Sequence, residues 1–182
     1  MQPMKFLSNW LMENANEDHY IFSAKDLRSL LPDLSNESFK VLLSRAVRSA
    51  YLTRVCRSIY LYKKSMKNDG LLLFHVASYL RSDKFNYISL ETVLSDAGVI
   101  SQMPINWISI ISSGRSSKIS CGVFGTIEFV HTNRKPDEVM AHLSYDAKCG
   151  TWRASINLAL QDMKTTRRNC DLIDWDIANE LI

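Results

Sequence analysis

The sequence contains no long run of apolar residues. Its longest stretch without a charged side chain, residues 97–114, includes Gly, Pro, Asn, Gln and several Ser, which excludes a membrane-spanning helix there. The first twenty residues lack the apolar core of a signal peptide, so we predict no export signal. We therefore expect a cytoplasmic protein, whose 182 residues suit one medium domain or two small ones.

Motifs for disulfide bonds and metal sites are also missing. The four cysteines are far apart and form no Cys-x-x-Cys pair, which is typical of free thiols in a reducing compartment. No two of the four histidines have the spacing of metal ligands. The sequence therefore predicts no metal site and no bound cofactor.

Acidic residues are absent from residues 38–68, which carry eight cationic side chains. A solvated protein surface usually mixes both signs of charge, so this stretch is unusual. Residues 1–68 contain eleven Lys or Arg against six Asp or Glu, a balance of +5, whereas residues 69–182 contain eleven against thirteen, a balance of −2. The charge distribution predicts a basic first domain, as expected of a protein that meets a polyanion.

The start of the chain shows the periodicity of two helices separated by a strand. Residues 4–12 predict an amphipathic helix, and residues 20–22 predict a short strand. Ser23 is placed to cap a second helix, which Pro32 ends.

A third helix and a hairpin follow. The helix begins after Ser35 or Asn36 and runs to about Ala50, because its apolar residues recur every three or four positions. Two β-prone runs, residues 52–55 and 59–62, predict a hairpin. Helix, strand, helix, helix and hairpin is the order of a winged helix-turn-helix, in which the third helix enters the major groove and the wing contacts the backbone or minor groove of DNA.

The cations of the basic stretch fall on the predicted third helix and wing. Side chains opposite the apolar face of that helix are candidates for contact with base edges and phosphates, and a valine suits the methyl group of thymine; they are Lys40, Val41, Ser44, Arg45 and Arg48. Cations on or beside the wing would neutralise phosphates; they are Arg54, Arg57 and Lys63. An ordinary solvated helix face, and for Lys63 a solvated linker, are the alternatives.

The second part of the chain predicts another α+β domain. Residues 63–70 are polar and lie where the charge balance reverses, so we place the linker there, between domains at residues 1–66 and 69–182. Two β-rich runs predict a small antiparallel sheet, and the flanking segments predict helices; the strands are at 106–114 and 125–133, and the helices at about 71–81, 90–98, 154–164 and in the acidic tail.

Four segments, taken in order along the chain, resemble the AbiEi family of antitoxins from bacterial abortive-infection toxin–antitoxin systems. Together they cover roughly residues 20–165, and they are IFSAKDLRSLL with LLSRAVRSAYLTRVCRSIYLY, then YISLETVLSDAGVI, ISSGRSSKISCGVFGTIEFVHT and RASINLALQDM. The resemblance implies a winged helix that binds inverted repeats in the promoter of its own operon and represses it. It also implies a second domain that counteracts a nucleotidyltransferase-like toxin, with no stable complex required.

The sequence departs from the family pattern at two glycines near the wing, which are Ala50 and Ser58 here. Where a left-handed backbone needs glycine, replacement costs about 1 kcal/mol, so we expect a wing of different shape. This motivates an alternative function, a protein-interaction module whose winged helix no longer binds DNA. In the fourth segment the family's Pro, Glu and Lys are replaced, so a role for that charge pair is not expected; the residues here are Ile156, Asn157 and Leu158.

The polar segment SSGRSSK, residues 112–118, lacks the frame of a P-loop and predicts a hairpin turn between strands. It carries Arg115 and Lys118, a candidate second basic patch toward DNA or an RNA-bound toxin. Its serines lack the context of a nucleophile elbow, and nothing in the sequence brings Asp162 to a histidine as an acid–base pair. The sequence therefore predicts no enzymatic activity.

Overall fold

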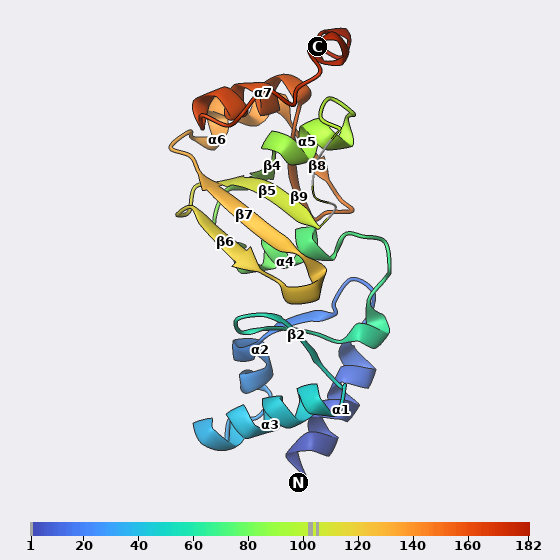
Figure 1. Cartoon of the computed structure of the whole chain (residues 1–182). Helices are drawn as coiled ribbons and strands as arrows, with labels where there is room; N and C mark the ends of the chain where they lie inside the picture. Colours follow the sequence, from blue (N-terminus) through green and yellow to red (C-terminus); the bar gives the residue numbers. More distant parts are fainter. Residues whose placement is uncertain (1, 102–103, 105) are drawn as a thin grey trace. The chain divides into compact units, whose positions relative to one another are not determined.

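The chain is α+β and divides into two compact units, Met1–Gly70 and Leu71–Ile182. The computed structural model describes residues 2–101, 104 and 106–182 (Figure 1). The boundary between the units falls at the end of the predicted linker, residues 63–70, which includes the 3₁₀ turn η1 (Lys63–Ser65). Within the described residues, no helix has both the length and the apolar character needed to cross a bilayer.

The first unit is built in the predicted order of helix, strand, two helices and two strands. Its elements are α1 (Pro3–Asn14), β1 (Ile21–Ser23), α2 (Ala24–Ser29), α3 (Asn36–Arg48), β2 (Thr53–Cys56) and β3 (Ile59–Leu61). The strands form an antiparallel sheet in the order β1-β3-β2, so the first strand of the unit pairs with the last.

Side-chain caps determine where α2 and α3 begin. Ser23 Oγ accepts a hydrogen bond from the Asp26 backbone N–H, and the Asp26 carboxylate accepts one from the Ser23 N–H, which completes a capping box. Ser35 Oγ accepts from the Ser38 N–H at the start of α3. Both caps satisfy backbone donors that the first turn of a helix leaves unpaired.

α3 buries one face and exposes the other. Its apolar face joins α1, α2 and the sheet in one core, whose buried residues are Leu7, Leu11, Phe22, Leu27, Leu31, Phe39, Leu42, Leu43, Ala46, Leu52 and Tyr62. Val47, an apolar residue of the same helix, is nevertheless 36% exposed, and the helix ends two residues before the predicted end at Ala50.

The helix ends there because Ala50 has a left-handed backbone, with φ at 57°. The Ala50 N–H donates to the Val47 carbonyl and the Tyr51 N–H donates to the Ala46 carbonyl, which is a Schellman motif. Ser58, in the turn between β2 and β3, is also left-handed, with φ at 62°. Both residues therefore adopt the conformation that glycine favours, despite their side chains.

The second unit is built around a mixed six-stranded sheet in the order β6-β7-β5-β4-β9-β8. Its strands are β4 (Asn86–Ile88), β5 (Trp107–Ser112), β6 (Ser117–Ser120), β7 (Thr126–His131), β8 (Leu143–Asp146) and β9 (Thr151–Ala154). Its helices and 3₁₀ turns are α4 (Leu72–Leu80), α5 (Leu90–Asp96), η2 (Gly122–Phe124), α6 (Pro136–Val139), η3 (Met140–His142), α7 (Ile156–Thr165) and α8 (Trp175–Glu180).

Helices cover both faces of this sheet (Figure 1). Successive residues of a strand point to opposite faces. On β7, Glu128 faces the side of α5 and α7, where it meets Arg168, whereas Phe129 faces the end of α4, where Arg81 stacks on its ring. The two faces of β7 therefore carry different chemistry, one an ion pair and the other an aromatic ring under a cation.

The prediction of a small antiparallel sheet is wrong for this unit. β5 and β7 pair in parallel, and β6 lies outside β7 at the edge of the sheet. The burial of the strands explains the arrangement: β7 has three consecutive buried residues, Ile127 to Phe129, whereas β6 alternates half-buried and exposed positions. A strand that is buried on both faces belongs in the interior of a sheet, and an amphipathic one suits the edge. Residues 113–116 are therefore not a hairpin turn but a connection past the end of β7.

Candidate functional site

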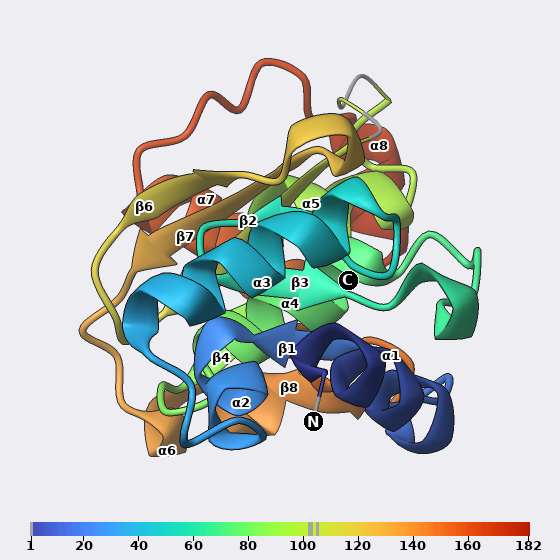
Figure 2. The ribbon, with the colours of Figure 1, turned by 90° about the horizontal axis from the view of Figure 1, so that it is seen from below.

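All eight residues predicted to contact DNA are exposed on the first unit: Lys40, Val41, Ser44, Arg45 and Arg48 on α3, Arg54 on β2, Arg57 in the turn after β2, and Lys63 in η1. The five on α3 are spaced one and three residues apart, so they share one face of the helix. In Figure 2, α3 is turned toward the viewer. Val41 is 48% exposed, an apolar side chain among cations.

In the described part of the first unit, the cations of this face make no ion pair. Within residues 2–70, the carboxylates that the structure describes form no ion pair with them, although Lys67 and Glu17 of the same unit pair at 2.6 Å. Arg54 Nε donates to the Cys56 carbonyl at 3.3 Å, which directs this side chain along the hairpin. The α3 face and the hairpin therefore concentrate uncompensated positive charge, which attracts polyanions.

The turn that carries Arg57 is fixed to the rest of the first unit. The carbonyl of Ser58 accepts a hydrogen bond of 2.8 Å from the backbone N–H of Ala24, the first residue of α2. The left-handed Ser58 and this bond hold the hairpin tip in one position relative to the helices of the unit. Arg57 is therefore presented on a rigid element, which lowers the entropy lost on binding.

The candidate second basic patch lies in the second unit and is partly compensated. Arg115 is exposed on the connection between β5 and β6. Lys118 Nζ lies 3.6 Å from Glu128 Oε1 and 5.1 Å from the centre of the Trp107 ring. The structure therefore does not make these two residues a surface like the α3 face, because a buried carboxylate already opposes Lys118.

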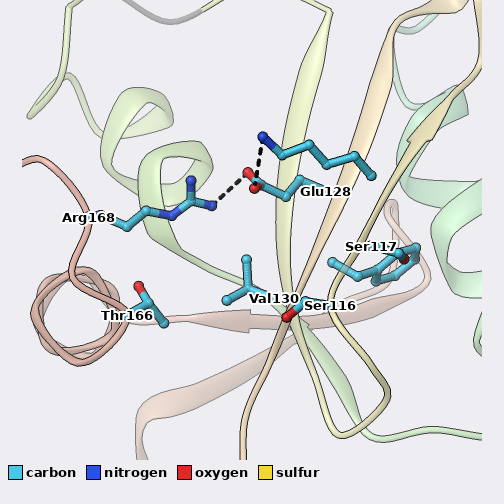
Figure 3. A pocket seen from close by; sticks show the side chains of 8 residues that line it. Ser116, Ser117, Glu128, Val130, Thr166 and Arg168 are labelled. Atoms are coloured by element: carbon cyan, nitrogen blue, oxygen red, sulfur yellow. Dashed lines mark hydrogen bonds and ion pairs between the residues drawn. The ribbon is translucent and has the colours of Figure 1, made fainter.

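A pocket of about 400 Å³ opens beside Lys118 (Figure 3). Its lining comes from β6, β7 and the end of α7: Ser116, Ser117, Lys118, Glu128, Phe129, Val130, Thr166 and Arg168. Glu128 stands between two cations, with Arg168 Nη2 at 2.6 Å from its Oε2. Arg168 Nε is also 3.4 Å from Glu91 Oε1 on α5, so two carboxylates orient this guanidinium.

Of the residues that line this pocket, the sequence analysis had marked only Lys118 as a binding residue. One signal was present: Glu128 interrupts the apolar pattern of a strand that is otherwise buried. A carboxylate in such a strand predicts a cationic partner, since an unpaired buried charge is costly. The partner, Arg168, is forty residues further along the chain and has no distinguishing spacing.

Arg81 fixes the connection that forms the rim of the pocket. Its guanidinium donates to Ser112 Oγ and Ser117 Oγ, each at 2.9 Å, and to the carbonyl of Arg115. The same group lies 3.9 Å from the centre of the Phe129 ring. Burial lowers the pKa of Arg81, but an arginine remains charged at neutral pH.

A second buried ionic cluster ties α7 to β4 and to the segment after β7. The Asp162 carboxylate is 3% exposed and accepts from Ser89 Oγ at 2.7 Å and from Arg134 Nη1 at 2.6 Å. Burial raises the pKa of Asp162, and the bonds from Ser89 and Arg134 oppose that shift. The two carboxylate oxygens of Asp162 are thus engaged by Ser89 and Arg134.

No protein-family model matches the chain, and no curated protein matches it. Among the residues that the structure describes, no group of three or more His, Cys, Asp or Glu side chains is placed to hold a metal ion. All four cysteines are free thiols, three of them buried. Among the described residues, the two candidate binding sites are therefore the cationic face of the first unit and the polar pocket of the second.

Proposed function

We propose that the chain is a cytoplasmic DNA-binding repressor whose first unit is a winged helix-turn-helix. The observation that carries this proposal is α3: one face is buried in the core and the opposite face presents cations that no described carboxylate of the unit neutralises. The order of the elements and the β1-β3-β2 sheet support the same fold. α3 enters the major groove, where Arg45 and Arg48 reach bases and phosphates.

The hairpin between β2 and β3 is the wing in this proposal. Arg54 and Arg57 neutralise phosphates and supply affinity with little sequence information. The alternative, an interaction module that has lost DNA binding, was motivated by Ala50 and Ser58. Both residues keep the left-handed backbone of glycine, which favours DNA binding over that alternative.

We further propose that the second unit makes this repressor the antitoxin of a toxin–antitoxin pair. The support is the resemblance of four segments to AbiEi antitoxins, three of which lie in the second unit. The partner would be a nucleotidyltransferase-like toxin, and the operator would be inverted repeats in the promoter of the shared operon. Arg115 and Lys118 are candidates for a contact with nucleic acid in this second role.

A gel-shift titration on the DNA upstream of the gene, repeated across a salt series, tests the first proposal. We expect the logarithm of the affinity to fall linearly with the logarithm of the salt concentration, because bound cations on DNA are released. Arg57→Ala should weaken binding to all sequences and lower the slope by about one, as expected for one lost phosphate contact. Arg48→Ala should weaken operator binding by about ten-fold or more.

Lys25→Ala is the matched control, since Lys25 is an exposed cation on α2, outside the proposed interface. The DNA-binding role would be refuted if the affinity for DNA did not change with salt concentration. It would also be refuted if Lys25→Ala and Arg48→Ala lowered the affinity equally. Tight capture of a protein partner without retention on promoter DNA would favour the interaction module.

Co-expression with the neighbouring open reading frame tests the antitoxin role separately. If a nucleotidyltransferase-like gene lies next to this one, we expect its expression to arrest growth and this chain to restore it. Arg48→Ala should lose repression of a promoter fusion but still restore growth, because the two roles belong to different units. Failure of the wild-type chain to restore growth would refute the antitoxin role and leave the DNA-binding result unaffected.

A further inference from the structure

The pocket of the second unit presents one hydroxyl group as a hydrogen-bond donor. Ser116 Oγ accepts from the backbone N–H of His131 at 2.9 Å. A hydroxyl carries one proton and two lone pairs, so its proton still needs an acceptor, and it finds none in the part of the chain that the structure describes. The Ser117 hydroxyl is not part of this set, because it lies with Phe129 on the opposite face of the sheet, where it accepts from Arg81. Ser116 therefore offers a donor to whatever occupies the pocket.

Two cations that pair with Glu128 add further donors; Figure 3 draws both ion pairs as dashed lines. Arg168 uses Nε and Nη2 on Glu91 and Glu128, and within the described residues its Nη1 makes no hydrogen bond. Lys118 Nζ is 3.6 Å from Glu128, longer than a hydrogen bond, and its side chain is 63% exposed. The one carboxylate that lines the pocket is thus already engaged by Arg168, and Lys118 is held loosely.

Thr166, two residues before Arg168, has the reverse polarity. Its hydroxyl donates to the Asp162 carbonyl at 2.7 Å, so it has only lone pairs left. Thr166 therefore offers no hydrogen-bond donor to an anion, and its replacement serves as an internal control for the donor residues.

The donors are positioned before any ligand arrives. Arg81 is held between the connection and the Phe129 ring, and it fixes both the Arg115 carbonyl and the Ser117 hydroxyl. A Cβ on Gly114 would lie 2.8 Å from Arg81 Nη1, so the connection packs tightly on the guanidinium. Pre-positioned donors lower the cost of binding.

The backbone that delivers Arg168 is strained. α7 ends in a Schellman motif, in which the Arg167 N–H donates to the Lys164 carbonyl and the Arg168 N–H to the Met163 carbonyl. The left-handed position of this motif favours glycine, yet it is Arg167, with φ at 54°. This turn directs Arg168 back onto the sheet, and strained positions of this kind gather at binding sites.

We propose that this pocket binds a phosphate group of a nucleotide or a nucleic acid. A phosphate has only acceptor oxygens, and Ser116, Lys118 and Arg168 together supply only donors to it. On binding, Lys118 Nζ moves from Glu128 to a phosphate oxygen, while Arg168 keeps its carboxylate partners and contributes Nη1. The volume of about 400 Å³ is that of a small-ligand site and holds more than the phosphate alone.

Calorimetric titration of the full chain tests this site with three probes: inorganic phosphate, adenosine monophosphate and a short single-stranded oligonucleotide. Each titration has a control in which sodium chloride of equal ionic strength replaces the probe. The oligonucleotide is also titrated into the Arg48→Ala variant, in which nucleic-acid binding at the α3 face is weakened. Saturable binding of phosphate and the mononucleotide assigns the site to a free nucleotide. Binding of the oligonucleotide alone, retained in Arg48→Ala, assigns it to a nucleic-acid backbone.

Variants within the pocket test whether the probes bind at this site. We expect Lys118→Gln to weaken binding about ten-fold and Ser116→Ala several-fold, as for the loss of hydrogen bonds to a charged group. Thr166→Val should bind as the wild type does. Because Lys118 leaves the Trp107 ring on binding, tryptophan emission should change, and Trp107→Phe should remove this optical signal while the calorimetric affinity is kept.

These variants avoid Arg168 and Glu128, whose replacement would leave a buried charge unpaired and unfold the unit. The proposal is overturned if no probe binds beyond the salt control, or if Lys118→Gln binds as tightly as the wild type. It is also overturned if Thr166→Val loses as much affinity as Ser116→Ala. Promoter binding by α3 is measured with duplex DNA, so its outcome is independent of this one.

Discussion

Replacing Ala50 or Ser58 by glycine should stabilise the first unit. The two residues have φ at 57° and 62°, and for a residue with a Cβ this conformation costs about 1–2 kcal/mol. Glycine removes that cost but adds about 0.4–1 kcal/mol of conformational entropy to the unfolded chain. Both side chains are exposed, so no core packing is lost. The expected net gain is about 0.5–1 kcal/mol for each substitution.

Hydrogen exchange followed by mass spectrometry measures this gain on the full chain. Peptides from α3 report the opening free energy of the first unit separately from the second. In thermal unfolding the same gain should raise the midpoint of the first unit by roughly 2–8 °C, given about 4–8 °C per kcal/mol for a domain of this size. Because the two sites are separate, Ala50→Gly with Ser58→Gly should be close to additive.

Ser49→Gly is the matched control. Ser49 is exposed and adjacent to Ala50, but its φ is −88°, a region open to any residue. Glycine there adds entropy to the unfolded chain without relieving strain, so it should destabilise the unit by several tenths of a kcal/mol. If Ala50→Gly behaves like Ser49→Gly, the left-handed turn is not strained and the reasoning fails.

Three further predictions concern the second unit. Asp162→Asn should lower the free energy of unfolding, measured with urea, by about 3–5 kcal/mol, because it leaves the Arg134 charge without its partner. A loss below about 1 kcal/mol would contradict this prediction. Gly125→Ala should lower the free energy of unfolding in the same assay by at least about 2 kcal/mol, since the new Cβ would lie 2.1 Å from the Asn106 carbonyl oxygen. If the variant is as stable as the wild type, the backbone geometry at this position is contradicted. Burial raises the pKa of Cys149 from 9.0 to about 11, so the folded chain holds this proton more tightly than the unfolded chain. Stability should therefore fall as pH rises from 9 to 11, by up to about 2 kcal/mol, and fall less steeply in Cys149→Ser; equal slopes would contradict it.

Local structure was predictable where its cause lies within a few residues. Ser23 and Ser35 cap α2 and α3 through backbone groups three positions away, and the apolar repeat of α3 identified its buried face. The exposure of the predicted contact residues follows from the same repeat, since the opposite arc of a helix that packs on one side faces solvent. The sequence by itself therefore determined the elements of the first unit and the basic face of α3.

Only the tertiary structure decided how the second unit is assembled. Two β-rich runs predict strands but not their direction or neighbours, and β7 lies between β5 and β6 because its buried side chains need cover on both sides. The polar pocket follows from that order: Lys118 on β6, Glu128 on β7 and Arg168 after α7 meet only once β7 is in place. Such a site depends on pairings between distant segments, and no spacing along the chain records them.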